Sequence, residues 1–220
     1  MSLNASKVGD SRPRMEPMEP ATYPARTVHF ADLGLQARPD FAGETKPPVN
    51  MVALTYEFVD CFVLDEEGND DISKPRHLTE MVPFYSMDAE RAKSTARIKA
   101  LDPSGAANGD LLKLLDVPCM VTVVHNPRKE GGVWENVAGV APMREKDAKA
   151  CPPLVNPPRA LDLDNPDLDV FNSLPKFIQD KIKAGLDFEG SNLDGLLGYA
   201  EAGPDDDIPF DGGDDDENPY

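Results

Sequence analysis

Apolar and polar residues alternate most regularly between residues 49 and 64, where Leu54, Tyr56, Phe58 and Phe62 recur at even spacing. This alternation is typical of a β-strand with one buried face. Other apolar or β-branched runs predict strands over 22–33, 76–87, 118–125 and 133–143. Pro83 places the strand over 76–87 at an edge or a bulge, because proline cannot donate to a β-ladder.

Three further segments favour helices. Residues 89–101 are rich in alanine and lack glycine and proline, with Asp88 as a candidate N-cap. A short helix or turn is expected over 110–115. A last helix is expected after Ser173 as its cap, ending at Gly185. Its apolar face consists of Leu174, Phe177, Ile178 and Ile182. That face packs either on the β domain of the same chain or on another protein.

The predicted order is three strands, a helix and two strands, which is the order of a five-stranded Greek-key barrel. We therefore expect a mainly β fold, with one helix between strands 3 and 4, a short C-terminal helix and disordered ends. The expected organisation is a flexible arm over 1–20, the barrel over 21–145, a linker over 146–159, a helical extension over 160–190 and a disordered acidic tail over 191–220.

The net charge of −18 limits the function classes. Nine acidic residues and no basic ones lie in the last twenty positions, so half of the net charge belongs to the tail. The rest of the chain is still acidic, which argues against a generally basic nucleic-acid binder. Any contact with DNA must come from a local basic patch.

Cysteine usage and the absence of long apolar runs point to a reducing cytoplasm. Cys61, Cys119 and Cys151 are scattered and odd in number, so a disulfide framework is not expected. No run of 18 apolar residues predicts a membrane span, and the first twenty residues lack the apolar core of a signal peptide.

The sequence offers no constellation for catalysis. There is no phosphate-binding glycine loop, and His29, His77 and His125 show no metal-ligand spacing. The acidic residues of a proline-rich stretch could suggest a metal-dependent nuclease, but we interpret them as turn and cap residues: Asp162, Asp164, Asp167 and Asp169. We expect no enzyme activity, no cofactor and no metal.

Several segments resemble a family of bacteriophage single-stranded DNA-binding proteins with an oligonucleotide-binding fold (OB-fold). They are RTVHFADLGLQ (26–36), KPP (46–48), LTYEF (54–58), LLDVPCMVTVVHN (114–126), WENVAGV (134–140), DVFNSLP (169–175) and IQDKI (178–182). The resemblance covers roughly residues 21–188. It implies an OB-fold barrel that binds and protects single-stranded DNA during phage replication or recombination, in the host cytoplasm.

The tail carries a second resemblance. Residues 205–210 resemble the C-terminal tip with which bacterial single-stranded DNA-binding proteins dock partner enzymes, and residues 214–220 repeat the same acidic-then-aromatic order. This implies docking of a polymerase, a helicase or primase, or a recombinase through Asp205, Asp206, Asp207, Ile208, Pro209, Phe210 and Tyr220. A tethered polyanion can also mimic DNA and occupy the DNA-binding cleft. The alternative is a solubilising tail without a partner.

Sequence-tolerant binding of single strands needs cations for the phosphates and flat side chains on which bases stack. Nine residues are candidates: Lys74, Arg76 and Tyr85 in strand 3, Arg91, Lys93 and Arg97 in the helix, and Arg128, Lys129 and Trp134 in the loop between strands 4 and 5. The alternatives are that Trp134 plugs the barrel end and that the basic residues belong to solvated surfaces. The chain would then be an interaction or structural phage protein that does not bind DNA.

Overall fold

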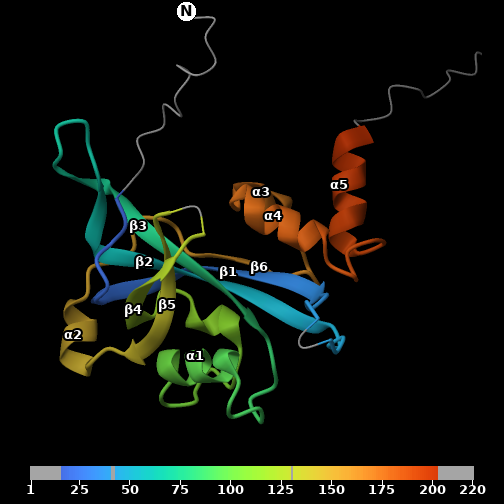
Figure 1. Ribbon diagram of the computed structural model, residues 1–220, viewed down its shortest axis with the longest axis horizontal. Helices are drawn as coiled ribbons and strands as arrows, with labels where there is room; N and C mark the ends of the chain where they lie inside the picture. The colour runs from blue at the N-terminus through green and yellow to red at the C-terminus, as the bar shows by residue number, and fades with distance from the viewer. Residues whose placement is uncertain (1–15, 41–42, 130, 203–220) are drawn as a thin grey trace, which may run out of the picture.

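The computed structural model describes residues 16–40, 43–129 and 131–202, and it is mainly β (Figure 1). The antiparallel strands are β1 (Thr22–Gln36), β2 (Val49–Leu64), β3 (Asp70–Pro83), β4 (Pro118–Pro127) and β5 (Val133–Pro142). They are hydrogen-bonded in the order β3-β2-β1-β4-β5, and the short β6 (Arg159–Leu161) pairs parallel with β1. Helix α1 (Lys93–Leu101) lies between β3 and β4 in the chain. The mainly β class is therefore confirmed.

The sheet is open, so the expected closed barrel is not found. Within the described residues, no β-ladder joins β3 to β5. Side chains bridge these two edges instead. Arg76 of β3 lies 3.0 Å from Glu135 of β5, and Arg97 of α1 donates both to Glu80 of β3, at 2.7 Å, and to the Val137 carbonyl of β5, at 3.4 Å. An edge strand needs such cover because its free backbone groups otherwise pair with other chains.

Strand β1 is the centre of the sheet and runs three residues further than predicted. Its first part pairs with both β2 and β4, and its second part pairs with β2 and β6. Two register shifts bend it, the second at Gly34, whose φ of 68° is a left-handed conformation. A side chain there would meet the Asp187 carboxylate, because a Cβ atom would lie 2.6 Å from it. The strand is buried on both faces, which hides the alternation that marks β2.

The sheet separates two hydrophobic cores. Leu54, Tyr56 and Phe58 of β2 point into the inner core, which α1 closes. The outer core lies between β1, β2 and the C-terminal elements β6, α3 (Leu168–Ser173), α4 (Lys176–Lys183) and α5 (Asn192–Ala202). Its helical side includes Leu174, Ile178 and Ile182. The predicted apolar face thus packs on its own chain, apart from Phe177, which is 53% exposed.

Several predicted boundaries are wrong, each for a local reason. Helix α1 begins at Lys93 rather than at residue 89, and Asp88 does not cap it, because residues 86–92 form turns closed by backbone hydrogen bonds. Strand β3 starts six residues earlier than predicted, since the turn after β2 is short. The predicted short helix is present as the 3-10 helix η2 (Leu111–Leu114), with Asp110 accepting from the amide of Leu112.

The C-terminal third is more structured than predicted. Ser173 ends α3 rather than capping α4, whose N-cap is Pro175. The expected linker contains α2 (Glu145–Ala150), and its Val155 amide donates to the buried Glu57 carboxylate at 2.7 Å. Helix α5 forms where disorder was expected, because its Leu193 is fully buried in the outer core. Most of the N-terminal arm and the tail from residue 203 lie outside the described residues.

Within the residues described above, no helix combines the length and apolar character that crossing a membrane requires.

The bridge between α1 and β3 should dominate stability. Replacing Arg97 by Met leaves the buried Glu80 carboxylate without its main partner, and we expect a loss of about 3–5 kcal/mol in the free energy of unfolding. Urea denaturation measures this. The matched control is Lys149→Met, which removes the exposed pair with Glu145 and should change stability little. Similar losses in both variants would contradict the assignment.

The same carboxylate gives a pH dependence. Burial raises the pKa of Glu80, but hydrogen bonds and charges from Arg97 and Lys93 outweigh it and hold the pKa below its usual value. A lowered pKa stabilises the folded state above the unfolded value of about 4.3, and this contribution is lost as the pH falls through the folded value. Denaturation at pH 6 and below pH 4 tests this. The difference in the free energy of unfolding between wild type and Glu80→Gln should be smaller below pH 4 than at pH 6. A constant gap would count against this role.

Candidate nucleic-acid interface

The hairpin between β4 and β5 presents the only tryptophan of the chain to solvent. Trp134 pairs with Asn126 near the end of the ladder, and 57% of its surface is exposed. Two glycines of the loop just before this strand, Gly131 and Gly132, both have positive φ angles and turn the chain tightly. Trp134 is therefore not a plug of the core, and it offers a flat surface at the rim of the sheet.

Arg128 stacks on this tryptophan. Its guanidinium carbon lies 3.5 Å from the ring centroid, which is a cation–π contact. Among the described residues, its Nε atom has no hydrogen-bond partner. The next residue, Lys129, is exposed. The hairpin thus joins a flat ring to two cations, which is the chemistry that one stacked base and its phosphates require.

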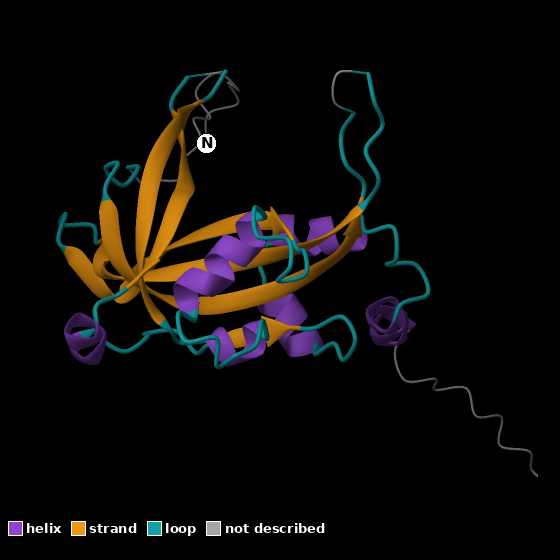
Figure 2. Ribbon diagram, turned by 90° about the horizontal axis from the view of Figure 1, so that it is seen from below, coloured by secondary structure: helices purple, strands orange, loops and turns teal. Residues whose placement is uncertain are grey.

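Two loops of the sheet project to the same side of the molecule (Figure 2). They are the β4–β5 hairpin and the β1–β2 loop, which includes Lys46. In five-stranded barrels that bind oligonucleotides, the loops in these two chain positions contact the ligand.

A second exposed aromatic residue and a cation line one hollow after β3. Tyr85 is 39% exposed, and its amide donates to Ser94 of α1 at 3.2 Å. Tyr85 and Arg91 line one shallow hollow on the surface, together with residues 88–92. The structure therefore brings together two candidates that lie six positions apart in the sequence.

The remaining basic candidates are engaged by carboxylates of the same chain. Arg97 and Arg76 are largely buried and bridge the open sheet edges, so we assign them to the fold. Lys93 is exposed but lies 2.7 Å from Glu80, and Lys74 pairs with Asp71 in the β2–β3 hairpin. The sequence shows these charges but not their partners, because Glu80 and Glu135 lie far from the arginines along the chain.

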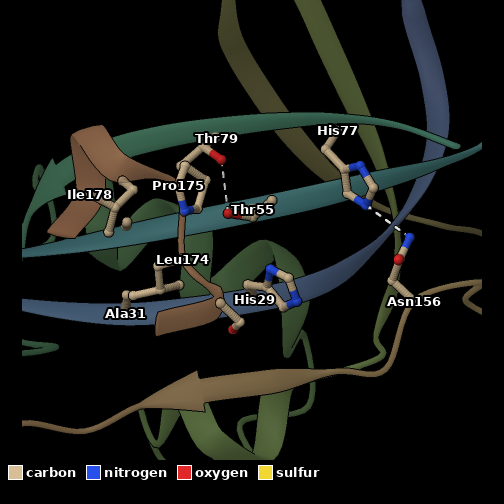
Figure 3. Close-up of a pocket in the computed structure, with 11 residues that line it drawn as sticks. His29, Ala31, Thr55, His77, Thr79, Asn156, Leu174, Pro175 and Ile178 are labelled. Carbon is tan, nitrogen blue, oxygen red and sulfur yellow. Dashed lines mark hydrogen bonds between the residues drawn. The ribbon is translucent and has the colours of Figure 1, made fainter. Parts of the chain in front are cut away.

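Sequence reasoning missed a pocket on the outer face of the sheet (Figure 3). His29, Thr55, His77, Thr79 and Asn156 contribute its polar side. Burial, His77 and Arg159, in that order, lower the pKa of His29 below its usual value. The alternation of His77 and Thr79 on β3 was the one available signal, but the residues come from four separate segments. Among the described residues, no cluster of histidine, cysteine and acidic side chains could hold a metal ion.

The predicted partner-docking residues Asp205, Asp206, Asp207, Ile208, Pro209, Phe210 and Tyr220 lie outside the described residues, so their role stays a prediction. Searches against protein-family models and against curated proteins find no match for this chain.

The stacked pair predicts how Trp134 fluorescence responds to quenchers. Because the ring is exposed, acrylamide should quench it efficiently. Iodide should quench it better than caesium at equal ionic strength, because Arg128 and Lys129 attract the anion. Arg128→Ala should reduce the preference for iodide, whereas Arg144→Ala, at the N-cap of α2, should not. An emission insensitive to acrylamide would contradict the exposed position.

Proposed function

We propose that this protein binds single-stranded DNA with little sequence preference and protects it during DNA replication or recombination. The observation that carries the proposal is the exposed Trp134 with the Arg128 guanidinium stacked on it. Base–aromatic stacking tolerates every base, because each has a π face. Tyr85 and Arg91, which line one hollow, and the exposed Lys129 would extend this surface.

The strand order supports an OB-type framework for this activity. The order β3-β2-β1-β4-β5 places β3 and β5 at the two open edges, where a barrel would close, and the Arg76–Glu135 and Arg97–Glu80 bridges span that seam. We infer an OB-like barrel closed by side chains rather than by a backbone ladder. This framework is the one that the resemblance to phage single-stranded DNA-binding proteins implies, and we propose the host cytoplasm as the location.

The charge of the chain shapes the expected binding. With a net charge of −18, the whole-protein field repels DNA, so affinity depends on a few local contacts. Each phosphate contact with a single strand contributes about −0.7 to the slope of log K against log salt. Three or four cations therefore predict a slope of about −2 to −3. The acidic tail would compete with DNA for the same cations and, once displaced, dock replication proteins.

Fluorescence anisotropy of a labelled oligo-dT strand, at several salt concentrations, tests the proposal. Trp134→Ala should weaken binding about 5- to 150-fold, because stacking contributes about 1–3 kcal/mol per base. Phe177→Ala is the matched control, since Phe177 is similarly exposed but lies on α4. Arg128→Ala should also lower the salt slope by about 0.7, whereas Arg144→Ala should leave it unchanged.

Deleting residues 203–220 removes eight acidic residues and leaves every described element in place. If the tail mimics DNA, the truncated protein should bind oligo-dT more tightly, and unchanged or weaker affinity would reject the mimicry. Absence of binding by both the full-length and the truncated protein would overturn the DNA-binding proposal. It would favour the alternative of an interaction protein that does not bind DNA. The ion pairs of Arg76, Lys93 and Arg97 agree with that alternative, because they occupy basic side chains that could otherwise contact phosphates.

A further inference from the structure

The pocket on the outer face of the sheet has a polar floor built by strand register. His29, Thr55 and Thr79 are neighbours across β1, β2 and β3, so they form one row. The two threonine hydroxyls lie 2.9 Å apart, and Figure 3 shows His29 beside Thr55. His77 lies opposite Glu57 in the next row and closes the pocket at one end.

The opposite wall is apolar. Leu174, Pro175 and Ile178, from the α3–α4 connection and α4, face the row of polar side chains. Ala31 and Ala53 on the floor leave space above the sheet, and the cavity measures about 230 Å³. Ser173 and Pro175 at the rim are exposed, so the pocket opens to solvent. An engineered cavity of about 150 Å³ is enough to bind benzene. The pocket therefore has room for a heteroaromatic ring with its substituents.

The electrostatics of the pocket favour an uncharged ligand. Its lining residues include no lysine, arginine, aspartate or glutamate. The buried Glu57 carboxylate lies directly behind it, 3.1 Å from Nε2 of His77 and 2.8 Å from Nδ2 of Asn156. A phosphate placed in the pocket would be repelled by this carboxylate. Burial, with the charges of His77 and Arg159, lowers the pKa of His29, which favours the neutral form of its imidazole.

The polar floor can offer both a donor and an acceptor to such a ligand. Each threonine hydroxyl has one hydrogen and two lone pairs, and the bond between Thr55 and Thr79 uses only one hydrogen. A neutral imidazole has one N–H group and one acceptor nitrogen. In its neutral form His29 therefore offers one group of each kind. Adjacent donors and acceptors beside an apolar wall match the edge and face of a flat heterocycle.

We propose that this pocket binds one nucleobase of the bound strand. The base would lie against Pro175, with its hydrogen-bonding edge toward Thr55, Thr79 and His29. This inference rests on the proposed function, because single-stranded DNA supplies unpaired bases, the uncharged and planar part of the ligand. It adds an anchoring site away from the β4–β5 hairpin, one that recognises the base rather than the phosphate.

Histidine resonances give a direct test with free nucleosides as probes. The chain has three histidines, and His125 lies outside the pocket, where its Nε2 atom contacts the Met18 carbonyl. Titration of the full chain with thymidine or deoxyadenosine should shift the imidazole signals of His29 and His77 and leave that of His125 unchanged. Inorganic phosphate at the same concentration should shift neither. Equal shifts by phosphate, or none by any nucleoside at millimolar concentration, would overturn the proposal.

Variants of the threonine pair test the role of the pocket in strand binding. The double variant Thr55→Val with Thr79→Val keeps side-chain shape and strand preference but removes both hydroxyls. It should weaken oligo-dT binding about tenfold, as expected for two lost hydrogen bonds. The matched control is Thr22→Val with Thr122→Val, because these hydroxyls also lie 2.9 Å apart across two strands but outside the pocket. Unfolding curves establish that both double variants fold.

The outcomes separate this inference from the proposed function. If both double variants bind oligo-dT as strongly as the wild type does, the pocket is rejected and the DNA-binding function is kept. Loss confined to the Thr55 and Thr79 variant would support the pocket. Nucleoside shifts at His29 and His77 without any oligo-dT binding would support the base site and reject the proposed function.

Discussion

The structure depends on one buried ionic contact, between Arg97 of α1 and Glu80 of β3. The carboxylate also accepts from Tyr56 at 2.9 Å and pairs with Lys93, so strand β2, strand β3 and helix α1 meet at one group. The same guanidinium reaches the Val137 and Ala138 carbonyls of β5. A buried charge is tolerated only when its hydrogen bonds are satisfied. The hydrogen bonds that satisfy Glu80 and Arg97 also hold α1 over the gap between β3 and β5. Tyr85, whose amide donates to Ser94 of α1, is held by the same helix.

The sequence predicted best those elements whose cause is local. Strand β2 has the predicted bounds, because large apolar residues alternate along it with smaller or polar ones. Strand β1 extended beyond its prediction, since both of its faces are covered and Gly34 allows a bend. Helix α5 was missed, because its order comes from the burial of Leu193 among residues far away in the sequence. Closure of the sheet could not be predicted either, since it depends on how far apart two strand edges lie.

In the candidate site, too, contacts between residues close in the sequence were predicted and contacts between distant residues were not. Trp134 and Arg128 were predicted together, because a short hairpin keeps neighbouring residues close. Arg76 and Arg97 looked equally basic, but distant carboxylates hold them within the fold. The outer pocket combines residues from position 29 to position 178 and has no sequence motif. Charge and aromaticity can be counted in a sequence, whereas the partner of each charge is decided by tertiary structure.

The pairing of β6 with β1 has a consequence for how the chain folds. His29 pairs with Arg159, so this contact forms only after most of the polypeptide has been synthesised. Until then the outer faces of β1 and β2, with Ala31, Leu33 and Ala53, have no cover from α3 and α4. Contacts of such long sequence separation form late and slowly. A nascent chain that has completed its five main strands therefore still exposes an apolar strip, which only the last third of the polypeptide covers.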